Sequence, residues 1–239
     1  MPRPSSRQSG LNKTCGRSLH RSATPFHAMP IKTQHPKLIV IAGPNGSGKT
    51  TFTDQVLRHD WSTGCIFINP DEIAKNVFGD WNSPGAVMKA VIRAQELREE
   101  CLRDRKSMLL ESVFSAPEKL DFIRQAKHAD FFVRFFFIGT DGPHINAARV
   151  VRRVMDGGHD VPIAKIISRY NRSIANSAVA MAMVDRAYAY DNSVDDRDPR
   201  KLFRTREGEI VKTYADLRHH AWGRMMVENW EGALAEHPL

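Results

Sequence analysis

Residues 43–50 read Gly-Pro-Asn-Gly-Ser-Gly-Lys-Thr and directly follow the apolar run 38–42. This is the spacing G-x-x-x-x-G-K-[ST], between an expected buried strand and an expected helix. The glycines let successive backbone N–H groups point at one spot, and a helix N-terminus adds its positive dipole end there. The pattern predicts a nucleoside triphosphate site in which Lys49 reaches the β- and γ-phosphates and the Thr50 hydroxyl holds Mg²⁺. The expected nucleotide contacts are Gly43, Pro44, Asn45, Gly46, Ser47, Gly48, Lys49, Thr50 and Thr51.

Asp71 is the candidate proton acceptor. It follows the expected strand 65–69, and open parallel sheets bind ligands at the carboxyl ends of their strands. A carboxylate there can take the proton of a substrate hydroxyl that attacks the γ-phosphate. Asp71 also precedes a helical run, where Asp is a favoured N-cap. The sequence leaves both roles open, and the two are compatible.

Glu111 and Ser112 stand at the carboxyl end of a further expected strand, residues 107–110, and so at the same edge of the sheet as Asp71. A carboxylate beside a phosphate site carries an electrostatic cost unless it binds metal or substrate or transfers a proton. Glu111 is therefore expected to hold a substrate hydroxyl or to support the metal, with an exposed strand-end acid as the alternative. Ser112 is a further substrate-binding candidate.

An Arg-rich segment is the second unusual feature. Arg149 and Arg153 lie one helical turn apart, the glycines at 157–158 stop the helix, and Pro162 suits the start of another. The second helix carries further cations at Lys165, Arg169 and Arg172. Arginines on a closing flap stabilise the charge that develops during phosphoryl transfer. The alternative is a solvated basic surface. His159, between the two helices, is expected to be a structural loop residue.

The elements that must position these residues alternate between strands and helices. This order predicts an α/β fold with a parallel sheet that helices cover on both faces. The expected strands are residues 37–42, 65–69, 107–110, 131–138 and 187–190, and a hairpin is expected over 201–212. The expected helices are 49–57, 84–104, 146–155, 163–183 and a C-terminal helix from 214.

Charge and composition set further bounds. Residues 1–36 hold six basic residues and no acid, so they carry +6 of the net charge of +8 and leave +2 for residues 37–239. This tail is expected to be disordered, with a transit peptide or a true start at Met29 as alternatives. Residues 37–239 are expected to form one domain, and their small net charge argues against nucleic acid as a partner.

No apolar stretch has the ~20 residues of a membrane helix. The three cysteines are widely spaced, which favours a reducing, cytoplasmic location.

Several motifs together resemble the zeta toxin family, in its chromosomal, stand-alone form. They are the phosphate loop, Asn-Pro-Asp-Glu-Ile-Ala at 69–74, Leu-Glu-Ser-Val-Phe-Ser at 110–115, and Arg-Val-x-x-Arg-Val-x-x-Gly-Gly-His-x-Val-Pro at 149–162, followed by Arg-Tyr-x-Arg-Ser at 169–173. The resemblance covers about residues 37–212. It implies a P-loop kinase fold with a helical, Arg-rich lid that uses ATP and Mg²⁺.

Family members phosphorylate a hydroxyl of a nucleotide sugar, UDP-N-acetylglucosamine. The resemblance places Asp71 as the proton acceptor, Glu111 as a substrate-contacting acid, and Arg153 and Arg169 as lid arginines; Arg152 is the alternative to Arg153. It also implies an antitoxin partner, of which the sequence itself carries no sign. The expected function is an ATP-dependent small-molecule kinase with Lys49, Asp71, Arg153 and Arg169 as catalytic residues. The alternatives are a P-loop ATPase, a polynucleotide kinase-like protein acting on another acceptor, and a non-catalytic nucleotide-binding regulator.

Overall fold

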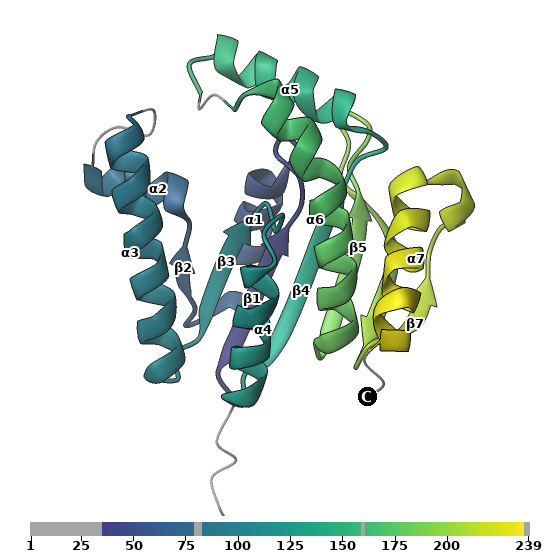
Figure 1. Cartoon of the computed structure of the whole chain (residues 1–239), viewed down its shortest axis with the longest axis horizontal. Coiled ribbons are helices and arrows are strands. Elements are labelled where there is room, and N and C mark those ends of the chain that lie inside the picture. The colour runs from purple at the N-terminus through teal and green to yellow at the C-terminus, as the bar shows by residue number, and fades with distance from the viewer. Residues whose placement is uncertain (1–34, 79–82, 159–160, 237–239) are drawn as a thin grey trace, which may run out of the picture. The chain divides into compact units, whose positions relative to one another are not determined.

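The structure is a computed structural model that describes residues 35–78, 83–158 and 161–236. The basic tail, up to residue 34, and His159 lie outside the described residues, so the interpretations made for them stay predictions. In the described part, a seven-stranded sheet carries helices on both faces (Figure 1).

The sheet has the strand order β2-β3-β1-β4-β5-β6-β7. The first five strands along the chain are parallel to one another, and β6 and β7 extend the sheet in antiparallel fashion. The strands are β1 (Lys37–Ala42), β2 (Ile66–Ile68), β3 (Met108–Ser112), β4 (Phe132–Gly139), β5 (Arg186–Asp191), β6 (Arg200–Arg206) and β7 (Glu209–Thr213). The five expected strands and the hairpin are confirmed, and this mostly parallel sheet has the arrangement of a P-loop kinase fold.

The helices of the described part cover the two faces unequally. Side chains from α3, α4, α6 and α7 pack on one face in the larger core cluster, and α1 alone among the α-helices packs on the other. Figure 1 views the sheet from the side of the four helices. The helices are α1 (Lys49–Leu57), α2 (Pro70–Phe78), α3 (Pro84–Arg103), α4 (Glu118–His128), α5 (Pro143–Met155), α6 (Ile163–Met183) and α7 (Ala221–Glu236).

Strand alternation explains how β1 and β4 build both cores. Val40, Phe135 and Phe137 point to the four-helix face, whereas Ile41 and Phe136 point to α1. All five are at most 1% exposed. Burying each of these side chains stabilises the fold by about 1.5–3 kcal/mol. The centre of the sheet is therefore rigid, and its carboxyl edge is a fixed frame for polar side chains.

Two expectations about helices need correction. Helix α4 was not expected, although Leu120, Ile123 and Ala126 lie three residues apart and are buried. The C-terminal helix begins at Ala221 rather than at Tyr214, because the Tyr214 N–H donates to the Leu202 carbonyl (2.7 Å) and continues the sheet. Every helix of the described part is too short or too polar to span a bilayer.

Candidate active site

The phosphate loop needs glycine at two positions. Gly46 and Gly48 have φ of +74° and +90°, in the left-handed region. A Cβ would lie 2.5 Å from the Asn146 carbonyl oxygen at Gly46 and 2.3 Å from Asn192 Nδ2 at Gly48. Helix α1 begins at Lys49 with no side-chain hydrogen bond at its N-cap. The first N–H groups of α1 are thus left for an anion.

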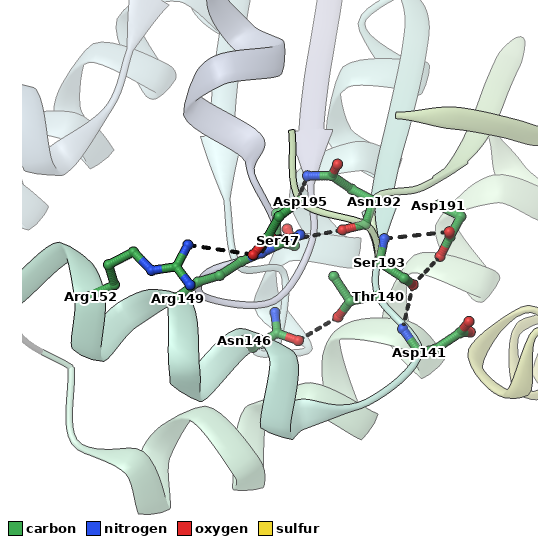
Figure 2. A network of polar contacts seen from close by, with 10 residues as sticks. All are labelled: Ser47, Thr140, Asp141, Asn146, Arg149, Arg152, Asp191, Asn192, Ser193 and Asp195. Atoms are coloured by element: carbon green, nitrogen blue, oxygen red, sulfur yellow. Dashed lines mark hydrogen bonds and ion pairs between the residues drawn. The ribbon is translucent and has the colours of Figure 1, made fainter. Parts of the chain in front are cut away.

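Two asparagines from distant elements hold this loop in shape. Asn146 of α5 donates to the Asn45 carbonyl (2.7 Å), and Asn192, just after β5, donates to the Ser47 carbonyl (2.8 Å). Asn146 also accepts a hydrogen bond from the buried Thr140 hydroxyl at the end of β4 (Figure 2). Neither asparagine was a sequence candidate. Both donate to backbone carbonyls, so these two contacts use none of the loop's N–H groups.

Lys49 is buried near three of the other expected site residues. Its side chain is buried, and Nζ donates to the Pro44 carbonyl oxygen at 2.9 Å. Burial lowers the pKa of Lys49, the negative charges of Glu111 and Asp71 oppose that shift, and the positive charge of Arg153 adds to it. Glu111, Asp71 and Arg153 therefore lie within electrostatic reach of the Lys49 ammonium.

Glu111 binds helix α1 through two hydroxyl groups. The Thr50 hydroxyl donates to Oε1 at 3.0 Å, and the Thr53 hydroxyl donates to Oε2 at 2.9 Å. Glu111 is held there because β3 pairs with β1 in a register that aligns it with Ile41. The sequence left open whether Glu111 holds a substrate hydroxyl, supports the metal or is an exposed strand-end acid. Its contact with the Thr50 hydroxyl favours the role beside the metal. Thr53 was not a sequence candidate, although it lies one turn after Thr50 on the same helix.

The neighbouring acids suit a divalent cation. The pKa of Glu72 is raised, first by burial and then by the negative charges of Glu111 and Asp54. The Thr50 hydroxyl donates a hydrogen bond to Glu111, so its oxygen lone pairs are left for a metal. Hydroxyl and carboxylate oxygens are the donors that Mg²⁺ prefers. The residues present therefore fit the expected ion, with Thr50 as its protein ligand.

Asp71 is not the N-cap of α2. Helix α2 begins at Pro70, and the Asp71 N–H donates to the Asn69 side-chain oxygen at 2.9 Å. Asn69 is therefore the cap, and the N-cap alternative for Asp71 is wrong. No side chain of the described residues donates a hydrogen bond to the Asp71 carboxylate, which is exposed at the sheet edge. Proton acceptance remains the role predicted for it.

Two of the three arginines near the end of α5 share a partner, Asp195. Arg149 donates to Asp195 (2.8 and 2.6 Å) and to the Asn192 carbonyl (2.8 Å), and Arg152 makes a longer contact with Asp195 (3.4 Å) (Figure 2). Arg153 instead affects the pKa of Lys49. Arg149 and Arg152 thus tie α5 to the segment after β5. Arg153, and not Arg152, therefore acts on Lys49 electrostatically, and its role as the lid arginine stays a prediction. Arg149 is engaged by Asp195 and the Asn192 carbonyl.

The glycines at 157–158, expected to form a hinge, form the C-terminal cap of α5. Gly157 has φ of +81°, and the Gly158 N–H donates to the Arg153 carbonyl (2.9 Å), which together form a Schellman-type C-cap. Arg169 lies beyond this hinge on α6 and is partly exposed. No hydrogen bond or ion pair joins its side chain to the phosphate loop within the described ranges. The structure therefore brings Arg153, but not Arg169, to the site.

The turn after β3 is held by α6. Phe114 has φ of +58°, which is unusual for a bulky residue, and its N–H donates to the Ser112 hydroxyl oxygen (3.1 Å). From α6, Ser173 donates to the Val113 carbonyl (2.5 Å) and Asn176 to the Phe114 carbonyl (3.2 Å). Strain of this kind costs about 1–3 kcal/mol and is common at functional sites.

A cavity of about 420 Å³ adjoins this turn. Its floor is formed by Val40, Ile68 and Leu110 of the sheet, and its walls come from α3 and α4. Glu111 and Ser112 also line it. The cavity therefore shares Glu111 with the phosphate site and is large enough for a small organic molecule.

These features define a P-loop nucleoside triphosphate-binding protein with the fold of the P-loop phosphotransferases. The chain belongs to the AAA domain family AAA_33, which matches residues 38–173. An uncharacterized protein of Haemophilus influenzae is 31% identical over 137 residues, which cover 56% of this chain and 91% of that protein.

Solved structures share the fold at low sequence identity. The AvrRxo1-ORF1:AvrRxo1-ORF2 complex with ATP has a TM-score of 0.56 and 18% identity, covering 85% of this chain and 80% of that chain. The PezAT chromosomal toxin–antitoxin system of Streptococcus pneumoniae also has a TM-score of 0.56, at 17% identity, covering 85% of this chain and 87% of that chain. The fold expected from the zeta toxin resemblance is thereby confirmed.

Proposed function

We propose that this protein is an ATP-dependent small-molecule kinase that transfers the γ-phosphate of ATP to an acceptor hydroxyl. The observation that carries the proposal is the shared wall between the phosphate site and the cavity: Glu111 binds the α1 hydroxyls on one side and lines the cavity on the other. Hydrolysis of ATP by water needs no such acceptor cavity. The related fold crystallised with ATP supports ATP as the donor.

Each site residue has a separate role in the proposed reaction. The loop N–H groups and Lys49 hold the β- and γ-phosphates, and Asp71 accepts the proton of the attacking hydroxyl. Bound Mg²⁺, held by Thr50 beside Glu111, would neutralise phosphate charge. Arg153 stabilises the charge of the transferring phosphoryl group, and Arg169 joins it when the lid closes.

We propose a nucleotide sugar such as UDP-N-acetylglucosamine as the acceptor, on the strength of the zeta toxin resemblance. The fold relation to a toxin–antitoxin system makes an antitoxin protein the corresponding partner. We further propose that residues 37–239 act as one domain and that the reaction is cytoplasmic, in keeping with the free thiols of Cys65 and Cys101.

Incubation with γ-labelled ATP tests the proposal. The purified full chain is mixed with Mg²⁺ and a panel of nucleotide sugars, free sugars and oligonucleotides, and label is followed into each acceptor. Label in a nucleotide sugar supports the proposal, and label in an oligonucleotide favours the polynucleotide kinase alternative. Release of inorganic phosphate without any labelled acceptor indicates an ATPase, and no turnover indicates a regulator. Lys49→Ala, run in parallel, identifies label due to a contaminating kinase.

A further inference from the structure

Lys119 carries a half-buried charge without a partner. It lies at the start of α4 and lines the cavity. In the described part of the chain, no acceptor hydrogen-bonds or ion-pairs with its ammonium. Burial and the positive charge of Arg98 lower the pKa of Lys119 to about 8, and the negative charge of Glu118 only partly opposes them. A partly desolvated ammonium of this kind is costly unless an anion meets it.

Arg98 brings a second cation to the same cavity. It projects from α3, and its guanidinium lies 5.8 Å from the centre of the Phe122 ring. Burial lowers the pKa of Arg98, and the attraction of Glu99 opposes this shift. No carboxylate of the described residues forms an ion pair with Arg98. Stacking on an aromatic ring leaves the N–H donors at the edge of the guanidinium free to bind an anion.

The charge of Arg98 disfavours the charged form of Lys119, and it is one of the causes that lower the pKa of Lys119. Three acids also line the cavity: Glu99 and Glu118 are exposed, and Glu111 accepts hydrogen bonds from the Thr50 and Thr53 hydroxyls. A core that needed only packing would be served by apolar side chains at both positions. Two like charges that face one cavity from different helices instead match a ligand with about two negative charges.

We propose that Arg98 and Lys119 bind a phosphate or diphosphate group of the acceptor, so that the acceptor carries this group in addition to the hydroxyl that is phosphorylated. The inference rests on the proposed function for the identity of the cavity as the acceptor site. It excludes free sugars and simple alcohols as good acceptors. It also assigns acceptor recognition to two residues outside the motifs at 43–50, 69–74, 110–115 and 149–173.

Two variants and one control test the inference. Lys119→Gln and Arg98→Gln each remove one cation, whereas Lys89→Gln removes an exposed cation of α3 that does not line the cavity. The full chain is first saturated with Mg²⁺ and a non-hydrolysable ATP analogue, so that the phosphate loop is occupied. Calorimetry then measures binding of UDP, GDP and CDP and of the three matching nucleosides.

At least one diphosphate should bind more than tenfold tighter than its nucleoside, and each cavity variant should weaken that binding about 10- to 100-fold. Affinity for the ATP analogue should stay at the wild-type value. Lys119→Gln should not lower the melting temperature, because its ammonium has no hydrogen-bond or ion-pair partner among the described residues, and Arg98→Gln loses only its contact with the Phe122 ring. Lys89→Gln should match the wild type. The inference is wrong if no diphosphate binds better than its nucleoside, or if both cavity variants bind like the wild type.

Acceptor kinetics separate this inference from the proposed function. If label transfer occurs and Lys119→Gln raises the acceptor KM but not the KM for ATP, both stand. If transfer to an uncharged acceptor is efficient and unaffected by either variant, the kinase proposal stands and the anion site falls. If no acceptor is labelled but the diphosphate affinities change as stated, the anion site stands and the kinase proposal falls.

Discussion

Replacing Glu111 by Gln tests the site most directly, because Glu111 contacts both α1 and the cavity. The substitution keeps the shape and removes the charge. A hydrogen bond to a charged group contributes about 1.5–3 kcal/mol, and one between neutral groups about 0.5–1.5 kcal/mol. The bonds from Thr50 and Thr53 would therefore weaken by about 1 kcal/mol each. Because Thr50 is exposed and Glu111 also repels Glu72, the expected loss in the free energy of unfolding is only about 1 kcal/mol.

The functional loss should be much larger than the loss of stability. Removing a group that orients a metal ligand typically lowers metal affinity or activity 10- to 100-fold. The Mg²⁺ concentration at half-maximal label transfer should rise by that factor in Glu111→Gln, and the pKa of Glu72, measured by NMR, should fall. Glu96→Gln, an exposed acid on α3 paired with Arg93, is the matched control and should change neither. Wild-type dependence on Mg²⁺ in folded Glu111→Gln would refute the reasoning.

The other predictions concern the remaining machinery. Lys49→Ala should lower label transfer 10²- to 10³-fold or more in a protein that still melts like the wild type; wild-type turnover would contradict the kinase proposal. Asp71→Asn should keep ATP affinity in calorimetry and lose transfer 10²- to 10⁴-fold, since an amide does not accept the proton; a parallel fall in affinity would make its role structural. Arg153→Ala and Arg169→Ala should reduce the transfer rate more than ATP affinity, whereas Arg152→Ala should leave the rate near wild type; equal effects at 152 and 153 would reject the assigned register.

The sequence predicts the strands and the phosphate loop well because their signals are local. Residues 38–42 are continuously apolar, and the loop needs glycine at fixed positions whatever surrounds it. The strand order is different, because it depends on which strands pair across long distances. The placement of Glu111 beside β1, and hence its bonds to Thr50 and Thr53, follows from that pairing.

The residues that sequence reasoning missed lack such local patterns. Asn146 and Asn192 hydrogen-bond to loop residues that lie 101 and 145 positions away in the chain. A single asparagine in a helix or loop has no sequence pattern that indicates such a distant partner. Thr53 is the exception, since a threonine one turn after Thr50 faces the same side of α1. Lys119 and Arg98 belong to helices that carry many charges, so only the cavity distinguishes them from solvated surface residues.

The contacts of α6 limit how the proposed lid can move. Ser173 and Asn176 hold the turn after β3, and the Tyr170 hydroxyl donates to the Thr140 carbonyl at the end of β4. From Tyr170 onward, α6 is therefore fixed to the sheet edge. Arg169 immediately precedes this fixed part of α6. Because α6 holds the turn that borders the cavity, the same helix carries the proposed lid arginine and supports part of the proposed acceptor site.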